Sequence, residues 1–291
     1  MKAPAFRYHA PRTIADAIAL MSHLANARVL AGGQSLMPMM NLRVAGPDHL
    51  VDLGRIAELS GIEEDERGLS IGAMTSQRTI EKSTLVAAAC PLLAEAIAHV
   101  GHQQTRNRGT IGGSLCHLDP GAELPVVAAA LDAVLTVAGP RGSRQIAFRD
   151  FPADYLTSSL EADEILTRIH IPRQPPRTGA AFLEFNRRPA DFAILSVATT
   201  LTIDASGHIA GAAIAIGGAS FKPIRLDHAE ATLADRLPDA AAFAEAAAIA
   251  ASLPCDGDDL YPAAYRQDLC AVLVRRALTS AALRAGENDH V

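Results

Sequence analysis

The sequence predicts a protein of mixed helices and strands that is divided into two domains. Its 291 residues are enough for two domains of ordinary size or for one domain with subdomains. Strand-like and helix-like segments follow one another along the chain. The segment Pro172–Thr178 contains three prolines, which block both a helix and a strand ladder, so we expect the linker there. The two domains are then residues 1–175 and 176–291.

The N-terminal segments predict a strand, a helix and a second strand. Phe6–Pro11 has the character of a short edge strand. Thr13 is suited to cap the helix Ile14–Ala25, and Asp16 completes a weak capping-box pattern. Arg28–Ala31 is expected to be a short buried strand that runs directly into a pair of glycines.

Strands and helices also alternate between residues 49 and 171. Ile165, Ile169 and Ile171 fall on one face of a strand, because side chains alternate along a β-strand. The acidic run Glu63–Arg67 is expected at a solvated hairpin tip rather than in a metal site. We expect strands at His49–Leu53, Gly68–Ala73, Ala133–Val137, Arg144–Phe148 and Glu164–Ile171. We also expect a helix led by Thr79–Lys82, a helix at Leu92–Val100, and a buried helical turn or helix at Pro125–Ala130.

The second domain is expected to begin with strands and to end with helices. Leu195–Ile203 and His208–Ile216 are joined by a short polar turn, which predicts a hairpin. Gly217–Gly218 is interpreted as a turn, because no helix cap follows it. The other expected elements are a strand at Ala181–Asn186, helices at Leu226–Leu233, Asp239–Leu253 and Tyr261–Arg284, and a frayed tail at Gly286–Val291.

The composition argues against several classes of protein. A net charge of −6 and a pI of about 5.9 disfavour a nucleic-acid surface. The four cysteines lack a CxxC or metal-ligand spacing, which favours reduced thiols in a cytoplasmic protein, although four could form two disulfides in a secreted one. The N-terminus shows no apolar signal segment, and no apolar run reaches the ~18 residues that span a membrane.

The chain is organised around Gly101–Pro125, a polar and turn-rich stretch. A stretch so rich in Gly, Asn, Thr and Asp is not expected to form a core element, so its backbone amides need turns, side chains, water or a ligand as partners. Gly112 and Gly113 have no side chains to keep a ligand away from the main chain. A polyanion could therefore touch the backbone there.

Val29–Leu36 repeats this design nearer the N-terminus. A buried strand runs into Gly32 and Gly33, and Ser35 is suited to cap the helical turn that follows, which is a common way to present amides to a phosphate. A plain tight turn after a strand explains this stretch, taken alone, equally well. With both stretches in view, we expect two loops that hold one phosphorylated cofactor between them.

Several polar side chains near the second loop have both a functional and a structural interpretation. Arg106 and Arg108 could neutralise phosphate charge or form surface ion pairs. Asp119 and Glu123 could bond ribose or ribityl hydroxyls, or be a turn aspartate and a helix-entry glutamate. The neighbours Cys116–His117 are interpreted as a structural pair rather than as ligands.

The sequence contains no motif for catalysis by protein side chains. It lacks a G-x-G-x-x-G, a P-loop, a G-x-S-x-G and a compact His, Asp and Glu cluster. These absences fit a protein whose chemistry resides in a bound cofactor.

Two motifs, Ala31-Gly-Gly-Gln-Ser35 and Thr110-Ile-Gly-Gly-Ser114, give the chain a resemblance to a known family. It resembles the FAD-binding medium subunit of molybdenum hydroxylases, the group of aerobic carbon monoxide dehydrogenase and bacterial xanthine and N-heterocycle dehydrogenases. The resemblance covers nearly the whole chain, and it is specific because both glycine pairs occur in order and at the expected separation. It extends to Ile71–Thr75, Gly101–Thr110, Asp119–Pro125, Asp163–Leu166 and Arg187–Phe192.

The resemblance implies an α+β fold of the p-cresol-methylhydroxylase (PCMH) or vanillyl-alcohol-oxidase (VAO) type. Two subdomains, about residues 1–57 and 58–175, would clasp FAD. Residues 176–291 would form a small C-terminal α/β domain of the carbon monoxide dehydrogenase flavoprotein type.

The resemblance also assigns residues to the cofactor. The amides of Gly32–Ser35 and Gly112–Ser114 would hold the pyrophosphate. Thr110 and Glu123 would bond sugar or ribityl oxygens, and Leu166 would line the flavin pocket. The residues expected at FAD are Ala31, Gly32, Gly33, Gln34, Ser35, Leu36, Thr110, Gly112, Gly113, Ser114, Asp119, Glu123, Leu166 and Arg188, the last in a charged turn with Arg187 and Asp191 near the isoalloxazine.

The resemblance further implies a function and partners. The FAD, bound non-covalently, would accept electrons from two [2Fe-2S] clusters of a small subunit and pass them to an external acceptor, while a large subunit with a molybdopterin cofactor oxidises the substrate. We expect an (LMS)2 assembly, cytoplasmic or membrane-associated through the complex, and neither a catalytic side chain nor a metal site in this chain. The alternatives are a stand-alone FAD-dependent oxidase of the same fold and a non-enzymatic nucleotide-binding module.

Three features depart from the family pattern. Ser114 stands where relatives often have Asp or Asn, so one polar contact would be shorter or water-mediated. Glu184 stands where many have Lys, which predicts a lower flavin potential or a different local partner. The Cys-rich loop of relatives with an extra iron–sulfur cluster is missing, so we expect no cluster in this chain.

Overall fold

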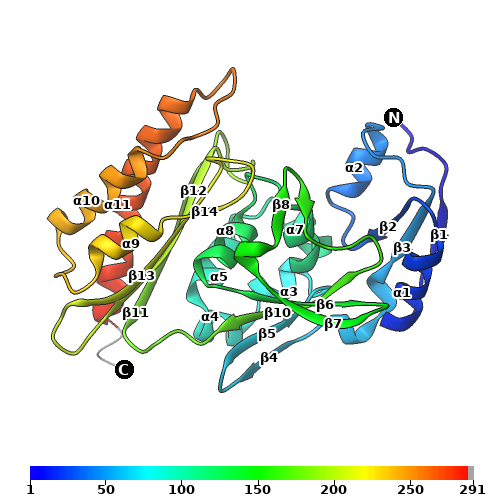
Figure 1. The fold of residues 1–291 in the computed structure, drawn as a ribbon, viewed down its shortest axis with the longest axis horizontal. Helices are drawn as coiled ribbons and strands as arrows, with labels where there is room; N and C mark the ends of the chain where they lie inside the picture. Colours follow the sequence, from blue (N-terminus) through cyan, green and yellow to red (C-terminus); the bar gives the residue numbers. More distant parts are fainter. Residues whose placement is uncertain (288–291) are drawn as a thin grey trace.

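The computed structural model describes residues 1–287, which form three sheets and one two-stranded pair. Figure 1 shows the sheets in chain order across the molecule. A three-stranded sheet lies at the N-terminal end, a five-stranded sheet in the middle and a four-stranded sheet in the C-terminal part. Sheets and helices are thus mixed along the whole chain, as the sequence predicts.

The three-stranded sheet is parallel and is built from the first fifty or so residues. Its strand order is β1-β3-β2. Thr13 caps α1 as predicted, because its hydroxyl oxygen accepts the amide of Asp16. The elements are β1 Arg7–His9, α1 Ile14–His23, β2 Ala27–Leu30, α2 Leu36–Asn41, β3 His49–Asp52 and the 3-10 turns η1 Leu53–Arg55 and η2 Ala57–Leu59.

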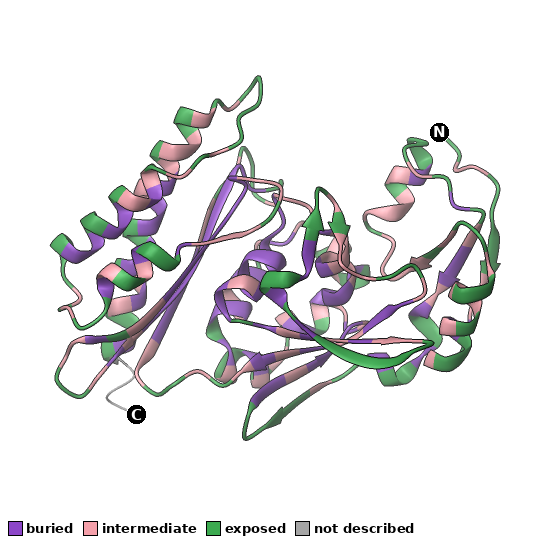
Figure 2. Cartoon of the chain, in the orientation of Figure 1, coloured by how far each residue is buried: buried purple, intermediate pink, exposed green. Residues whose placement is uncertain are grey.

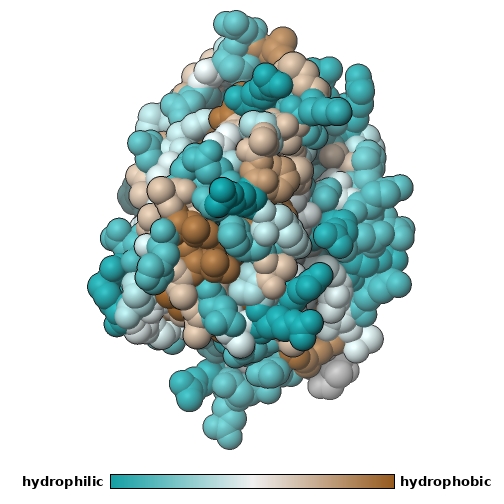
Figure 3. Space-filling view, turned by 90° about the vertical axis from the view of Figure 1, so that its right-hand side faces the viewer, coloured by the Kyte–Doolittle hydropathy of each residue, from teal (hydrophilic) through white to brown (hydrophobic). Residues whose placement is uncertain are grey.

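The surface at this N-terminal end is mostly hydrophilic. Figure 3 shows small brown groups separated by teal side chains. Tyr8, Leu42 and Val44 are among the exposed apolar side chains of this part. Single exposed apolar residues are ordinary on a protein surface.

The five-stranded sheet is antiparallel, with the order β4-β5-β10-β6-β7. The hairpin predicted at the acidic run is confirmed, because β4 and β5 pair with each other and the run forms most of β4 and the turn at Glu66 and Arg67. The strands are β4 Ile62–Asp65, β5 Gly68–Gly72, β6 Val134–Gly139, β7 Gly142–Ala147 and β10 Ile165–Pro172, and β8 Pro152–Asp154 pairs with β9 Thr157–Ser158. The helices are α3 Gln77–Glu81, α4 Thr84–Ala89, α5 Pro91–Ile97, α6 Gln103–Arg108, α7 Ile111–His117 and α8 Glu123–Ala130, with the 3-10 turn η3 Phe148–Asp150.

The prediction that Gly101–Pro125 forms no core element is wrong. This stretch contains α6, α7 and the start of α8, and Ile111, Leu115 and Leu118 are buried in the main core. Their spacing of four and three residues puts them on one side of the chain, although polar residues surround them in the sequence. Thr110 caps α7 with its hydroxyl oxygen, and Leu118 ends the helix in a left-handed conformation.

The four-stranded sheet lies between two layers of helices. α9, α10 and α11 cover one face, and α5 and α8 of the middle part cover the other, so the sheet is buried on both sides (Figures 1 and 2). β12 shows this burial directly, because eight of its nine residues are buried, the polar Ser196, Thr199 and Thr200 among them. The elements are β11 Thr178–Phe185, β12 Leu195–Ile203, β13 Ile209–Gly217, β14 Ile224–Arg225, α9 Asp227–Leu233, α10 Ala240–Ala251 and α11 Ala263–Glu287.

Two sequence boundaries in this part differ from the structure. Pro172 ends β10 and Thr178 begins β11, so the connection itself is residues 173–177. The tail predicted to fray from Gly286 is helical through Glu287, because α11 continues that far. The rest of that prediction, residues 288–291, lies outside the described residues.

The middle and C-terminal parts share one hydrophobic core. Phe182 of β11 and Ala198 of β12 belong to the same cluster as the apolar residues of α5 and α8. A polar contact closes the edge of this core: Arg284 of α11 pairs with Glu95 of α5 at 2.7 Å, and Glu95 also accepts the amide of Phe182 at 3.1 Å. The three-stranded sheet has a smaller core of its own around Val51.

Candidate cofactor-binding site

The structure brings the two predicted glycine loops together. A Cβ built on Gly32 would overlap the carbonyl oxygen of Arg108 and lie 2.8 Å from the Cα of Gly109. A Cβ on Gly113 would lie 3.3 Å from the Cβ of Ala31. The loops therefore touch through main-chain atoms, and this contact requires the absence of a side chain at position 32.

The first loop, residues 32–36, carries a run of backbone N–H groups without acceptors. Within residues 1–287, the amides of Gly32, Gly33, Gln34, Ser35 and Leu36 donate to no protein atom. Gly33 is left-handed, with a φ of +72°. Successive free N–H groups around a left-handed residue form the kind of concavity that binds anions. Because unpaired amides are costly unless water or a ligand satisfies them, the loop fits a phosphate group.

The predicted cap by Ser35 is wrong. Ser35 precedes α2, but its backbone is already helical and its side chain makes no capping hydrogen bond. Its hydroxyl group therefore adds a further donor at the loop instead of closing the helix.

The second loop offers fewer donors than expected. The amide of Gly112 donates to the carbonyl of Ala73 at 2.9 Å, and the amides of Gly113 and Ser114 both donate to Thr110. A Cβ on Gly112 would lie only 2.6 Å from the Cβ of Ala73. These amides are therefore committed within the protein, contrary to the expectation that they face a pyrophosphate. Gly112 serves the close packing of α7 on the segment after β5.

Thr110 and Asp119 both have structural roles in this arrangement. Thr110 is buried, and its hydroxyl oxygen caps α7. The Oδ1 atom of Asp119 accepts the amide of Gly121 at 3.0 Å, which is the turn-aspartate alternative. Each side chain keeps some capacity for a ligand, since a hydroxyl can still donate and a carboxylate has a second oxygen.

Glu123 opens α8 and is only 4% exposed. Burial raises the pKa of its carboxyl group to about 7; repulsion by Glu184 and Asp119 acts in the same direction, and His99 opposes it. Glu123 therefore exchanges its proton near neutral pH. A carboxyl group in this state can donate or accept a hydrogen bond to a hydroxyl of a ligand.

Glu184 lies beside this carboxyl group and has found local partners. Its side chain is 3% exposed, and its Oε1 atom lies 3.2 Å from Nδ1 of His99 and 2.7 Å from Nδ2 of Asn186. The hydrogen bond to Glu184 raises the pKa of His99. Within residues 1–287, the Oε2 atom of Glu184 is buried without a hydrogen-bond partner. The prediction of a different local partner for Glu184 is thus confirmed.

The two arginines before the second loop differ in their surroundings. Arg106 binds both carboxylate oxygens of Glu81 at 3.0 Å, and it donates to the carbonyls of Val100 and Gly101. Of the two alternatives for Arg106, a phosphate ligand or a structural ion pair, the structure shows the ion pair. Arg108 is exposed, and within residues 1–287 its side chain has no hydrogen-bond or ion-pair partner.

The two remaining predicted residues lie in different environments. Leu166 on β10 is 4% exposed and packs in the main core, so little of its side chain is available to line a pocket. Arg188 is exposed on the turn between β11 and β12. Ala190 in the same turn is left-handed, with a φ of +71°, so the turn has a defined backbone path.

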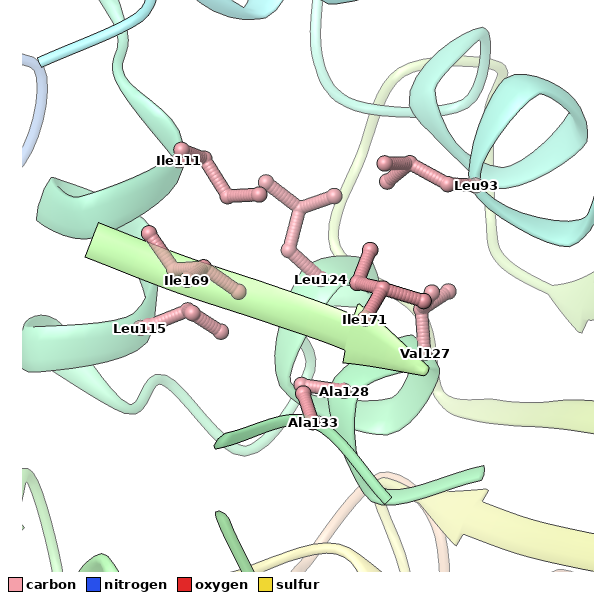
Figure 4. Close-up of a pocket in the computed structure, with 9 residues that line it drawn as sticks. All are labelled: Leu93, Ile111, Leu115, Leu124, Val127, Ala128, Ala133, Ile169 and Ile171. Carbon is pink, nitrogen blue, oxygen red and sulfur yellow. The ribbon is translucent and has the colours of Figure 1, made fainter. Parts of the chain in front are cut away.

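The small cavity in Figure 4 is a packing gap and not a cofactor site. Its volume is about 10 Å³, and its lining is apolar, with Leu93, Ile111 and Ile169 among the side chains around it. An apolar cavity of about one water volume offers no polar partner. Burial raises the pKa of the nearby Cys116 thiol to about 12, which disfavours a reactive thiolate. No group of three or more His, Cys, Asp or Glu side chains in residues 1–287 is placed to hold a metal ion.

Sequence reasoning missed His99 and Gln77. His99 meets Glu184 across 85 positions of sequence. Gln77 is buried beside Gly109, and its Oε1 atom has no partner within the described part of the chain. No local motif marks either residue, because each gains its neighbours only when separate elements pack.

Comparison with known proteins identifies relatives of the whole chain. A family model described as the FAD binding domain in molybdopterin dehydrogenase matches residues 4–174, and one described as the CO dehydrogenase flavoprotein C-terminal domain matches residues 180–281. The nicotine 6-hydroxylase medium subunit of Paenarthrobacter nicotinovorans is 40% identical over 286 residues, which cover 98% of this chain and 100% of that one. The carbon monoxide dehydrogenase medium chain of Afipia carboxidovorans is 37% identical, over 96% of this chain and 98% of that one.

The fold agrees with these relatives. A solved structure of carbon monoxide dehydrogenase from Hydrogenophaga pseudoflava matches with a TM-score of 0.94 and 36% identity, over 98% of this chain and 99% of that one. None of the helices in residues 1–287 is long and apolar enough to cross a membrane. The named relatives are subunits of dehydrogenases and hydroxylases, which are oxidoreductases. With its two glycine loops in contact and both family models matched, the chain belongs to the family of FAD-binding medium subunits of the molybdenum hydroxylases.

Proposed function

We propose that this chain is the electron-transfer subunit of a molybdenum hydroxylase. It accepts electrons from the [2Fe-2S] clusters of a small subunit and passes them to an external acceptor. The observation that carries the proposal is the run of unpartnered amides at residues 32–36, held against the second loop. Such a run is complementary to a diphosphate, whose oxygens accept N–H groups, and FAD is the diphosphate that the family binds.

The residues that would hold FAD come from both loops. Residues 32–36 would donate backbone amides and the Ser35 hydroxyl group to the diphosphate, and Gly112 and Gly113 let the second loop pack closely behind them. Glu123 and Thr110 bond hydroxyl groups of the sugar or ribityl chain. The proposed set remains Ala31, Gly32, Gly33, Gln34, Ser35, Leu36, Thr110, Gly112, Gly113, Ser114, Asp119, Glu123, Leu166 and Arg188.

The redox chemistry comes from FAD, which takes up two electrons one at a time when it is bound. The protein contributes charge, and Glu184 contributes a buried negative one. Glu184→Lys is expected to raise the midpoint potential of the flavin in a redox titration, and Glu184→Gln is expected to raise it less. Glu66→Lys, the same charge change at an exposed turn, is the control. An unchanged potential in both Glu184 variants would contradict this role.

We propose two partner subunits: a large one with the molybdopterin cofactor and a small one with the two clusters, in an (LMS)2 assembly. The names of the relatives as medium chain and medium subunit support a complex of at least three kinds of chain. The division into an FAD-binding domain of residues 1–175 and a C-terminal domain of residues 176–291 is supported by the two family matches. The four free cysteines support a cytoplasmic location.

The proposal is tested by co-purification of the tagged chain from its native host, followed by an absorption spectrum and a metal count. The expected result is a yellow-brown complex with one larger and one smaller partner, molybdenum and about four irons per flavin. A yellow chain that purifies alone, contains no metal and is bleached by a small alcohol or amine would instead be a stand-alone oxidase. A colourless chain would favour a nucleotide-binding module.

A further inference from the structure

Arg108 meets the first loop at the point where that loop has its free amides. It is the last residue of α6, and its carbonyl oxygen occupies the space that a side chain on Gly32 would need. The following residue, Gly109, also packs against Gly32. The Arg108 side chain therefore starts from a backbone that packs against Gly32, the first residue of the run with unpaired N–H groups.

The charge of Arg108 is not used by the fold. Arg78 and Arg106, which belong to α3 and α6, both bind the carboxylate of Glu81. Arg108 is exposed and pairs with no carboxylate in residues 1–287. Of these three arginines, only Arg108 forms no ion pair with any described residue. Its charge is therefore free for a ligand.

The free amides need such a charge if the ligand is a diphosphate. Backbone N–H groups are neutral donors, so they orient phosphate oxygens without cancelling their charge. A guanidinium group cancels charge and can donate two parallel hydrogen bonds to phosphate. A neutral ligand of similar shape gains nothing from that group.

We propose that Arg108 is the residue that selects ligands with a diphosphate at the first loop. This inference rests on the proposed function, because the diphosphate is that of FAD. Arg108 binds the phosphate oxygens beside residues 32–36 and thereby favours FAD and ADP over riboflavin and adenosine.

The test measures flavin affinity of the full-length chain after its flavin has been removed. Arg108→Gln is expected to weaken FAD binding by about tenfold to a hundredfold, the size of one charge-assisted hydrogen bond. The affinity for ADP, measured by competition, should fall by the same factor. The affinities for riboflavin and adenosine should not change. The difference in FAD affinity between the wild type and Arg108→Gln should shrink at high salt, because the Arg108 side chain is exposed. Arg108→Lys keeps the charge and should recover part of the affinity.

The matched control is Arg276→Gln, which removes an exposed arginine charge on α11. It is expected to bind FAD like the wild type. If the wild-type chain binds no FAD, the proposed function fails and this inference fails with it. If the wild type binds FAD and Arg108→Gln binds it equally well, only the role of Arg108 is refuted. An equal loss of FAD and riboflavin would also refute it, because the effect would then come through the fold.

Discussion

Glu123→Gln tests whether one buried carboxyl group makes the stability of the protein depend on pH. The pKa of Glu123 is raised from 4.5 to about 7, chiefly by burial. Between these values the folded protein holds a proton that the unfolded chain has released. The free energy of unfolding therefore falls as pH rises through this window, and it levels off above about pH 7.

The size of the effect follows from the same values. A change in pKa from 4.5 to about 7 corresponds to about 3 kcal/mol, since one pKa unit is worth about 1.4 kcal/mol. Gln has nearly the same shape and carries no charge at any pH, so the variant should lose this dependence. His99, whose pKa is raised by its hydrogen bond to Glu184, also contributes stabilisation that is lost as pH rises, and that part of the pH dependence should remain in the variant.

The assay is urea unfolding of the flavin-free chain at pH 5 and pH 8. The free energy of unfolding of the wild type should fall by up to about 3 kcal/mol from pH 5 to pH 8. That of Glu123→Gln should fall much less, so the variant should be the more stable protein at pH 8. Glu66→Gln, at an exposed position, should behave like the wild type. If Glu123→Gln loses as much as the wild type, the burial argument is refuted.

Two further substitutions test the packing of the loops. Gly32→Ala should push the first loop away from the carbonyl of Arg108, which lowers the free energy of unfolding by about 1–3 kcal/mol. It should also lower the FAD affinity measured in a fluorescence titration. The control is Gly46→Ala, whose added Cβ would have its nearest neighbour at 3.9 Å, and it should leave both quantities unchanged. Equal affinities for the two variants would show that the loops are not in contact. Arg106→Gln should lower the free energy of unfolding by about 3 kcal/mol, because it leaves Glu81 partly buried without its main partner. A urea titration measures this, and a midpoint as high as that of Arg108→Gln would contradict it.

The fold was predictable where apolar residues have a regular spacing. The strand with Ile165 and Ile169 and the helix capped by Thr13 are both present close to their expected bounds. The helices within Gly101–Pro125 are not predicted by the sequence, because the apolar residues of this stretch are few and lie among glycines and polar residues. Its helices depend on packing against Ala73 and the main core, which no local pattern reveals.

The site was predictable only in part for a related reason. Both glycine pairs were found, because glycine marks places where backbones approach closely. The sequence does not tell which amides remain free. Gly112 donates to Ala73, a residue 39 positions earlier in the chain, and only the folded arrangement assigns that acceptor. The contact of His99 with Glu184 depends in the same way on the packing of α5 against β11.

The four-stranded sheet is buried on both faces, so the two parts joined by the linker are not independently stable. The linker separates two domains in the sequence, but the domains share one core. Cleavage within residues 173–177 followed by separation of the halves would expose Phe182 and Ala198 on one half and the apolar faces of α5 and α8 on the other. Exposed apolar surfaces of that kind promote association, so each half made alone is expected to aggregate and the two made together to reassemble. A chimera between two relatives therefore needs compatible side chains where α5 and α8 pack against the four-stranded sheet. A crossover placed in the linker works only when the α5 and α8 of one relative fit the sheet of the other.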